Sequence, residues 1–185
     1  MIYRPMASWI LSFDVGIKNL GYALIRSDGY VGDAFTVCIK QRVNRVVDTI
    51  RTMRELMASL DLGDLPLSTV VVEKQLHRNP SMRVVQAIIQ TYFGIVFPST
   101  KVLEYSSRRK LSGEKCDSYR GRKKRAVELC TEYLDVKQPQ SNARERFNSL
   151  KKKDDAADAL LQGMSYLRIN EGLFDLGALF EEESS

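Results

Sequence analysis

The sequence predicts an α/β fold in which a five-stranded mixed sheet is flanked by helices. Three short β-type segments separated by glycine-containing turns open the chain, before any long helical pattern appears. A further apolar segment with three consecutive valines covers residues 65–73. Longer segments with apolar residues at helical spacing precede and follow it, at 44–60 and 81–97. This order of strands and helices favours a sheet with both antiparallel and parallel neighbours.

The first three strands are expected to form an antiparallel meander. Residues 9–14 have the composition of a strand, and Gly16 and Gly21 permit the turn into a second strand at 21–27. A turn at Ser27, Asp28 and Gly29 leads to a third strand at 30–39.

Two helices are expected on either side of the fourth strand. The valine run makes 65–73 a central strand that is covered on both faces. Residues 81–97 are apolar nearly all round, which predicts burial by more than one surface, either in the core or at a subunit interface. Residues 44–60 predict an amphipathic covering helix, whose inner face is Val46, Ile50, Met53, Met57 and Leu60.

The last third of the chain predicts a short fifth strand at 101–105 and a basic loop at 106–121. Helices are expected at about 122–134 and from Asp154 or Asp155 to about residue 168. The inner side of the final helix is predicted to be Ala157, Leu160, Leu161, Met164 and Leu167.

Length and composition predict one domain over residues 1–170, followed by a C-terminal tail at 171–185. The three cysteines show no CxxC spacing, so neither a disulfide framework nor a zinc site is indicated. No window has the apolar length of a membrane span. These features predict a protein that is not secreted and works in a cytosol-like compartment.

Basic residues are concentrated in two stretches. Residues 106–125 hold nine Lys or Arg against two acids, and residues 144–153 hold five against one. This uneven placement predicts a surface that faces a polyanion such as nucleic acid. The alternative is that these runs are solvated loops.

Four acidic residues stand at the ends of apolar segments. Asp14 ends the first strand, Glu73 ends the fourth, and Asp155 and Asp158 lie three residues apart on the final helix. Carboxylates next to a core are costly to desolvate, so their recurrence indicates that they gather around a cation. Oxygen ligands without His or Cys favour Mg²⁺ or Mn²⁺, and two such ions support phosphodiester hydrolysis.

The segments FDVGIKNLGYALI, VVVEKQ, GRKKRAVEL and DDAADAL resemble the RuvC-type Holliday junction resolvases of the RNase H-like superfamily, most closely their poxvirus branch. The resemblance covers roughly residues 8–168. It implies the RNase H-like fold and a homodimer that nicks four-way DNA symmetrically by two-metal-ion hydrolysis. Such an enzyme serves DNA recombination and the resolution of replicated viral DNA, which would place this chain in the host cytoplasm.

The resemblance also implies roles for individual residues. Asp14, Glu73, Asp155 and Asp158 correspond to catalytic metal ligands, with two Mg²⁺ per site and Mn²⁺ as a substitute. Lys124 corresponds to a family lysine near the scissile phosphate.

Three points stay open at these positions. Arg122, Lys123 and Arg125 crowd the segment of Lys124, so a neighbour could take its role. Asp154 is either a helix cap or a substitute ligand. Leu76 stands where bacterial members carry an aromatic residue used for stacking at the junction.

Eight basic residues from the two stretches are expected to contact DNA phosphates. They are Arg108, Arg109, Lys110, Arg122, Lys123, Lys151, Lys152 and Lys153.

Three other functions compete with junction cleavage. A general RNase H-like nuclease would cut hybrids or flaps on the same scaffold. An actin-like or sugar-kinase-like phosphotransferase would use an Asp-x-Gly turn but needs a second domain. A non-catalytic module would bind junctions through the basic loops alone.

Overall fold

Five strands form one mixed sheet in the order β3-β2-β1-β4-β5. The computed structural model describes residues 7–39, 44–60, 65–106 and 118–171. Strand β1 pairs antiparallel with β2 and parallel with β4, so it joins an antiparallel half of the sheet to a parallel half. The predicted five-stranded mixed sheet is confirmed. The strands are β1 (Trp9–Asp14), β2 (Asn19–Arg26), β3 (Val31–Cys38), β4 (Leu67–Glu73) and β5 (Lys101–Tyr105).

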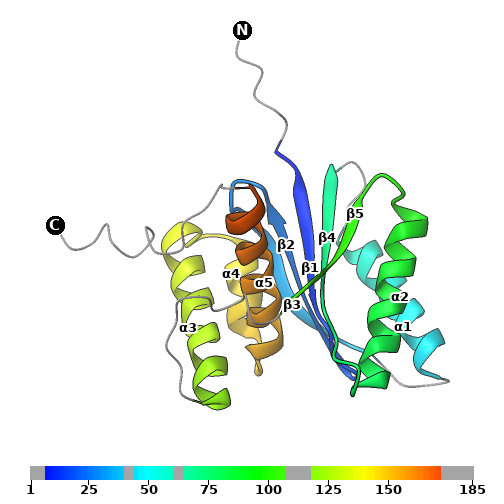
Figure 1. The fold of residues 1–185 in the computed structure, drawn as a ribbon. Helices are drawn as coiled ribbons and strands as arrows, with labels where there is room; N and C mark the ends of the chain where they lie inside the picture. The colour runs from blue at the N-terminus through cyan, green and yellow to red at the C-terminus, as the bar shows by residue number, and fades with distance from the viewer. Residues whose placement is uncertain (1–6, 40–43, 61–64, 107–117, 172–185) are drawn as a thin grey trace, which may run out of the picture.

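Helices cover both faces of this sheet (Figure 1). On one face α5 (Asp154–Glu171) lies across β1 and β2, with α3 (Tyr119–Lys137) and α4 (Asn142–Ser149) beside it. On the other face α2 (Pro80–Val96) covers β4 and β5, and α1 (Arg45–Ser59) packs against α2. Within the described ranges, no helix has the length and hydropathy of a transmembrane span.

Serine and asparagine side chains begin three of these helices by accepting a backbone N–H from the first turn. Asn44 caps α1, Ser118 caps α3 and Ser141 caps α4. Helix α3 therefore begins three residues before the predicted start, and α4 was not predicted. Residues 107–117 of the predicted basic loop and the predicted tail beyond 171 lie outside the described residues.

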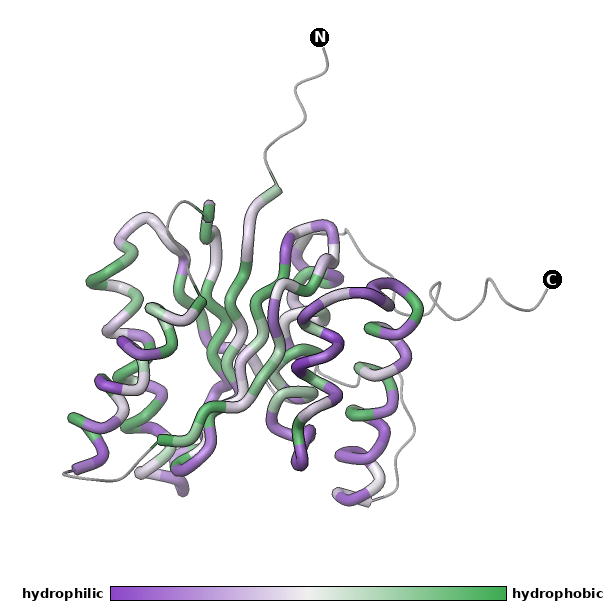
Figure 2. The backbone as a smooth tube through the Cα atoms, turned by 180° about the vertical axis from the view of Figure 1, so that it is seen from behind, coloured by the Kyte–Doolittle hydropathy of each residue, from purple (hydrophilic) through white to green (hydrophobic). Residues whose placement is uncertain are grey.

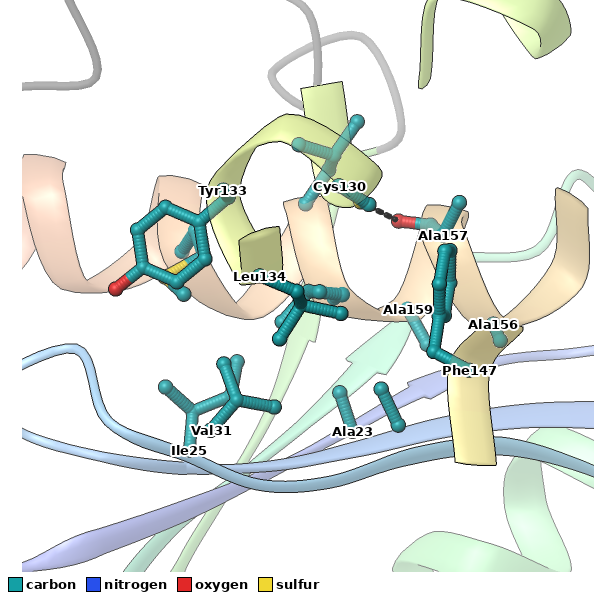
Figure 3. Packing of buried hydrophobic residues seen from close by; sticks show 14 of the residues in the cluster. Ala23, Ile25, Val31, Cys130, Tyr133, Leu134, Phe147, Ala156, Ala157 and Ala159 are labelled. Carbon is teal, nitrogen blue, oxygen red and sulfur yellow. Dashed lines mark hydrogen bonds between the residues drawn. The ribbon is translucent and has the colours of Figure 1, made fainter. Parts of the chain in front are cut away.

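Two hydrophobic clusters lie on opposite faces of the sheet. Val71 belongs to the cluster under α3, α4 and α5, whereas Val70 and Val72 belong to the cluster under α1 and α2. Figure 3 shows the first cluster, in which Phe147 of α4 and Leu134 of α3 pack with the alanines of α5. In Figure 2 the strands are largely hydrophobic, and the helices outside them carry much of the hydrophilic sequence. The prediction of a central fourth strand that is covered on both faces is confirmed.

The predicted inner face of α1 is wrong in part. Met53 is fully buried, but Val46 and Ile50 are 46% and 40% exposed. The helix packs through a more polar face that includes a buried carboxylate at Asp48, paired with Arg51 at 3.0 Å. Apolar spacing alone therefore misjudged the rotation of this helix. The residues that α1 buries are Asp48, Thr49, Thr52, Met53 and Leu56.

Helix α2 is buried on one face within the chain, so the alternative of a helix enclosed in the core is wrong, and the alternative of a subunit interface stays a prediction. Its buried residues are Val85, Gln86, Ile89 and Phe93. The opposite side leaves Ile95 73% exposed. Among the described residues, α2 therefore has an apolar face without a covering element.

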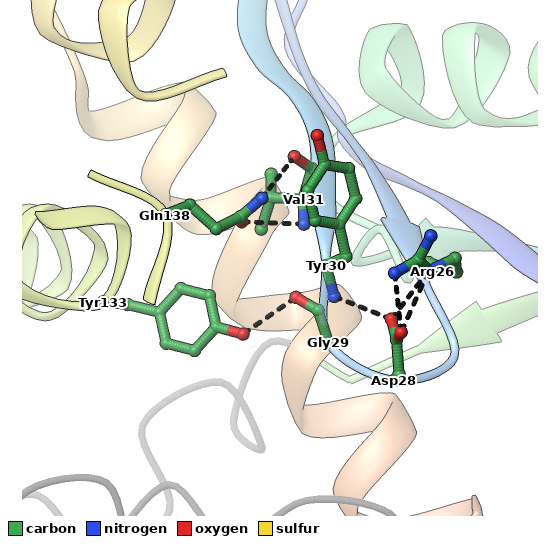
Figure 4. Close-up of polar contacts among 7 residues, drawn as sticks. All are labelled: Arg26, Asp28, Gly29, Tyr30, Val31, Tyr133 and Gln138. Carbon is green, nitrogen blue, oxygen red and sulfur yellow. Dashed lines mark hydrogen bonds and ion pairs between the residues drawn. The ribbon is translucent and has the colours of Figure 1, made fainter. Parts of the chain in front are cut away.

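Helix α3 is anchored to the turn between β2 and β3 (Figure 4). The hydroxyl of Tyr133 donates to the carbonyl of Gly29 at 2.8 Å, and the side-chain amide of Gln138 pairs with both backbone groups of Val31. Burial raises the pKa of Tyr133 to about 12, with the charge of Asp28 adding to the rise. These bonds hold the outer helix against the antiparallel half of the sheet.

Candidate active site at the carboxyl edge of the sheet

The two strand-ending acids lie side by side. Phe13 of β1 pairs with Val72 of the parallel strand β4, and Asp14 and Glu73 directly follow this pair. Neighbouring strands lie about 5 Å apart, and matched residues of parallel strands point to the same face. Both acids share the face of Ser12 and Val71, which is the face that α5 covers.

The beginning of α5 lies against the same edge. Gly21 of β2 is the partner of Asp14 in the antiparallel register. A Cβ atom at Gly21 would lie 2.0 Å from the backbone oxygen of Asp155, so only glycine permits this approach. The backbone of Asp155 therefore lies against Gly21, the strand neighbour of Asp14. Asp158 is one helical turn further along the same face of α5.

All four carboxylates lie where the core meets solvent. Asp14, Glu73, Asp155 and Asp158 are half-buried. Their chain neighbours Phe13, Val72, Ala156, Ala157 and Ala159 are fully buried. This placement holds the acids at an accessible edge while the residues beside them fix the backbone.

The acids have local polar partners in this structure. Glu73 accepts a hydrogen bond from the amide of Gln75 at 2.8 Å, and Asp155 pairs with Lys152 at 3.1 Å. Asp158 faces Cys130, whose thiol has a pKa raised well above its ordinary value by burial and then by this charge. A thiol held neutral in this way is a poor metal ligand.

Asp154 is not the cap of α5. The amide of Ala157 donates to the carbonyl of Lys153 at 2.8 Å, which makes Lys153 the cap and Asp154 the first helical residue. The carboxylate of Asp154 instead pairs with Lys123, and with Lys152 at 3.3 Å. Burial alone would raise the pKa of Asp154, but the two ammonium groups lower it below its ordinary value.

The donor chemistry of this edge fits a hard divalent cation. Four carboxylates from three elements share one edge and one face of the sheet, and the nearby thiol of Cys130 is neutral. Within the described ranges, however, no three or more His, Cys, Asp or Glu side chains are gathered closely enough to hold a metal ion. The elements converge here, and the ligand set remains a prediction.

The neighbouring lysines of α3 have different surroundings. Lys123 points to α5, where its pairing with Asp154 raises its pKa against the opposing effect of burial. Lys124 is 81% exposed and pairs with Glu128 at 3.5 Å. Only Lys123 therefore contacts the acidic helix directly.

An open hollow of about 520 Å³ lies between α3 and the start of α5. It brings together the two basic stretches that the sequence identified. Arg120 was not predicted, because the helix was expected to begin after it; it lies one turn before Lys123 and Lys124. The hollow is lined by Arg120, Lys123, Lys124, Val127, Glu128, Leu150, Lys151, Lys153 and Asp154.

The other predicted DNA contacts are placed differently. Arg122 is exposed on α3 outside this hollow, and Lys152 turns to Asp154 and Asp155. Leu76 is 55% exposed beyond the end of β4. Arg108, Arg109 and Lys110 lie outside the described residues.

A family model described as "Poxvirus A22 protein" matches residues 8–171. The chain belongs to this family. The Holliday junction resolvase of Fowlpox virus (strain NVSL) is 27% identical over 162 residues, which cover 85% of this chain and 91% of the relative. The resemblance to the poxvirus branch is therefore confirmed.

Solved structures agree on the fold. The Fowlpox virus resolvase, in complex with Holliday junction DNA, matches with a TM-score of 0.59 at 23% identity, over 90% of this chain and 99% of that one. The yeast mitochondrial Holliday junction resolvase Ydc2 has a TM-score of 0.60 at 17% identity, over 87% and 79%. RuvC of T. thermophilus, in complex with a Holliday junction substrate, has a TM-score of 0.55 at 14% identity, over 87% and 95%. The RuvC-type, RNase H-like fold is confirmed.

Proposed function

We propose that this chain is a Holliday junction resolvase, an Mg²⁺-dependent endonuclease that makes symmetric nicks in four-way DNA. One observation carries the proposal: the acid-bearing ends of β1 and β4 meet the beginning of α5 on one face of the sheet. The basic hollow lies beside this edge and offers contacts for DNA phosphates. Membership of the poxvirus family and the fowlpox relative support the same activity.

In this proposal Asp14, Glu73, Asp155 and Asp158 hold two Mg²⁺ ions, for which Mn²⁺ can substitute. Ions bound there would supply an activated water and neutralise charge on the leaving oxygen of the phosphodiester. The positive end of the α5 dipole favours the carboxylates in its first turn. The fully buried residues beside these acids anchor their backbone in the core.

The basic residues divide into two roles. Lys124, as the family resemblance implies, contacts the scissile phosphate, and its exposed side chain is available to do so. Lys123 and Lys152 hold Asp154 and Asp155, while Lys151 and Lys153 contact the backbone of the DNA through the hollow. Asp154 then orients Lys123 and is not itself a ligand.

Cleavage of a mobile four-way junction, with and without Mg²⁺, tests the proposal. Asp155→Asn removes a ligand and a negative charge near phosphate, so cutting is expected to be abolished while junction binding persists or tightens. Gel assays of cutting and binding measure both effects. Hybrid and flap substrates are the matched controls.

Two results would favour the competing functions. Faster cutting of the hybrid or the flap would indicate a general RNase H-like nuclease. Junction binding by the wild type without any cutting would indicate a non-catalytic module. The phosphotransferase alternative requires a second domain, and the described residues form one sheet with its helices.

We also propose that the protein acts as a homodimer in the host cytoplasm. A four-way junction has approximate two-fold symmetry, which two active sites related by a dyad would match. The exposed apolar face of α2, with Val84 and Ile95, is the candidate interface. The poxvirus family supports the location.

A further inference from the structure

A buried amide on α5 connects the helix to both acid-bearing strands. Gln162 is fully buried and lies one turn after Asp158 on the same face. Its Nε2 donates to the hydroxyl of Ser12 at 3.2 Å, the carbonyl of Phe13 at 3.0 Å and the carbonyl of Val71 at 3.3 Å. Phe13 directly precedes Asp14, and Val71 lies two residues before Glu73.

The helix backbone is pressed against the sheet at this point. A Cβ atom at Gly163 would lie 2.4 Å from Cδ1 of Ile25 and 3.1 Å from Cβ of Ser12. The approach of Gly21 to Asp155 is a second close contact, near the beginning of the helix. The two glycine contacts bring α5 close to the sheet, and the Gln162 amide bonds the helix to β1 and β4.

Burying an amide costs desolvation free energy that packing alone does not require. Within the described residues, the Oε1 atom of Gln162 accepts no hydrogen bond, so the side chain bears a desolvation cost that Leu or Met would avoid. Apolar residues make up much of this interface, including Ala159 and Leu160. The hydrogen bonds of Nε2 to two strands are what an apolar side chain could not provide.

We infer that Gln162 is a positioning residue that sets the separation between the acids of α5 and those of β1 and β4, and thereby the affinity for the divalent metal. The inference rests on the proposed function. Asp14 and Glu73 are fixed by the sheet, whereas the positions of Asp155 and Asp158 depend on the rotation of a helix. Gln162 couples that rotation to the backbone beside the strand acids.

The experiment compares wild type with Gln162→Met, which keeps the length and the apolar volume but removes the hydrogen bonds. Two quantities are measured: the rise in melting temperature when Mg²⁺ is added without DNA, and the Mg²⁺ concentration that gives half-maximal cleavage. The variant is expected to lose most of the Mg²⁺-induced rise and to need roughly ten-fold more Mg²⁺. At saturating Mg²⁺ its cleavage rate should recover towards that of wild type.

Ser165→Ala is the matched control. Ser165 lies one turn further along the same face, is fully buried, and hydrogen-bonds to Tyr105 of β5, a strand that carries none of the four acids. It should lower the metal-free melting temperature without changing either Mg²⁺ response. If Ser165→Ala changed the Mg²⁺ responses as much as Gln162→Met does, the inference would be overturned. Loss of any buried hydrogen bond of α5 would then be enough to weaken Mg²⁺ binding.

Three further outcomes would overturn the inference in distinguishable ways. Equal Mg²⁺ responses in wild type and Gln162→Met would make the residue an ordinary core residue. Loss of cooperative melting in both Gln162→Met and Gln162→Leu would show that the amide holds the fold itself. No Mg²⁺ response in wild type would remove the proposed function together with the inference.

Discussion

The two lysines at positions 123 and 124 show how strongly one residue of helical rotation changes a side chain's surroundings. Lys123 is largely covered and paired with Asp154, whereas Lys124 extends into solvent. Adjacent residues on a helix point about 100° apart, so only one of them can face α5. Their neighbours therefore predict different consequences of substitution.

Lys124→Ala is expected to reduce junction cleavage by roughly 10²-fold, because a cation near the scissile phosphate stabilises developing charge. Its melting temperature should stay close to that of wild type, since the pair with Glu128 is exposed. Lys123→Ala should instead cost about 1–2 kcal/mol of stability by leaving Asp154 partly unpaired. Single-turnover cleavage and thermal melting separate the two, and the opposite pattern would transfer the phosphate role to Lys123.

Gly21 is a second position where a single atom is decisive. Gly21→Ala would force a Cβ atom into the backbone of Asp155, which must move away from Asp14. We expect a stability loss of about 1–3 kcal/mol and a marked loss of cleavage. Gly94→Ala is the stability control, because open space surrounds its Cβ position and alanine favours the helix. Urea unfolding measures both, and equal stabilities would contradict the close contact.

At the scale of elements, the attachment of α3 predicts a dependence on alkaline pH. The pKa of Tyr133 is raised to about 12 in the folded protein and lies near 10 in the unfolded chain. The unfolded state therefore loses its proton first, so the contribution of Tyr133 to stability is complete below pH 10 and is lost as pH rises towards about 12. The free energy of unfolding should fall across this window by up to about 3 kcal/mol on account of this residue.

Tyr133→Phe tests this attachment. The variant should lose about 1 kcal/mol at neutral pH, because the bond to Gly29 disappears. Its stability should then decline less steeply above pH 10. Tyr22, whose pKa is also raised by burial and by Asp33, will leave some dependence in both proteins. The free energy of unfolding is measured by urea unfolding at each pH. An equally steep decline above pH 10 in wild type and Tyr133→Phe would contradict the anchoring role of Tyr133.

The sequence predicted most elements, and the exceptions have physical causes. All five strands and the helices α1, α2, α3 and α5 were expected from apolar periodicity. Helix α4 was missed because an eight-residue helix that buries only Ala143 and Phe147 has too weak a pattern. Besides the burial of Phe147, a distant ion pair attaches this helix, at 2.6 Å between Arg146 and the buried carboxylate of Asp33. No local pattern encodes such a partner.

The candidate site was also predictable in part. The apolar segments were enough to place Asp14 and Glu73 at the ends of two strands, whereas their common face follows from the parallel register of β1 and β4. The contact between Gly21 and Asp155, and the choice of Lys123 as the partner of Asp154, depend on how α5 and α3 are rotated. Rotation is decided by packing between elements, which single-sequence periodicity does not resolve. The rotation of α1 was misjudged for the same reason.

At the scale of the whole molecule, the proposed dimer makes a specific prediction. Ile95→Asp places a charge on the exposed face of α2 and should convert a dimer to a monomer, measured by light scattering. Ile89→Asp cannot serve this purpose, because Ile89 lies in the core of the monomer. Val46→Asp, on the exposed side of α1, is the matched control for an added surface charge. A dimeric Ile95→Asp protein would exclude this face as the interface.

The valine run of β4 has a consequence for how the chain finds its fold. Three consecutive valines place the same side chain on both faces of the sheet in either of two registers. The valines alone therefore do not specify the register in which β4 pairs with β1. A slip of one position would drive the carboxylate of Glu73 among Phe93 and its neighbours, where an unpaired charge is prohibitive. The Glu73 carboxylate, which is proposed to bind metal in the folded protein, thus also makes the shifted register of β4 unfavourable during folding.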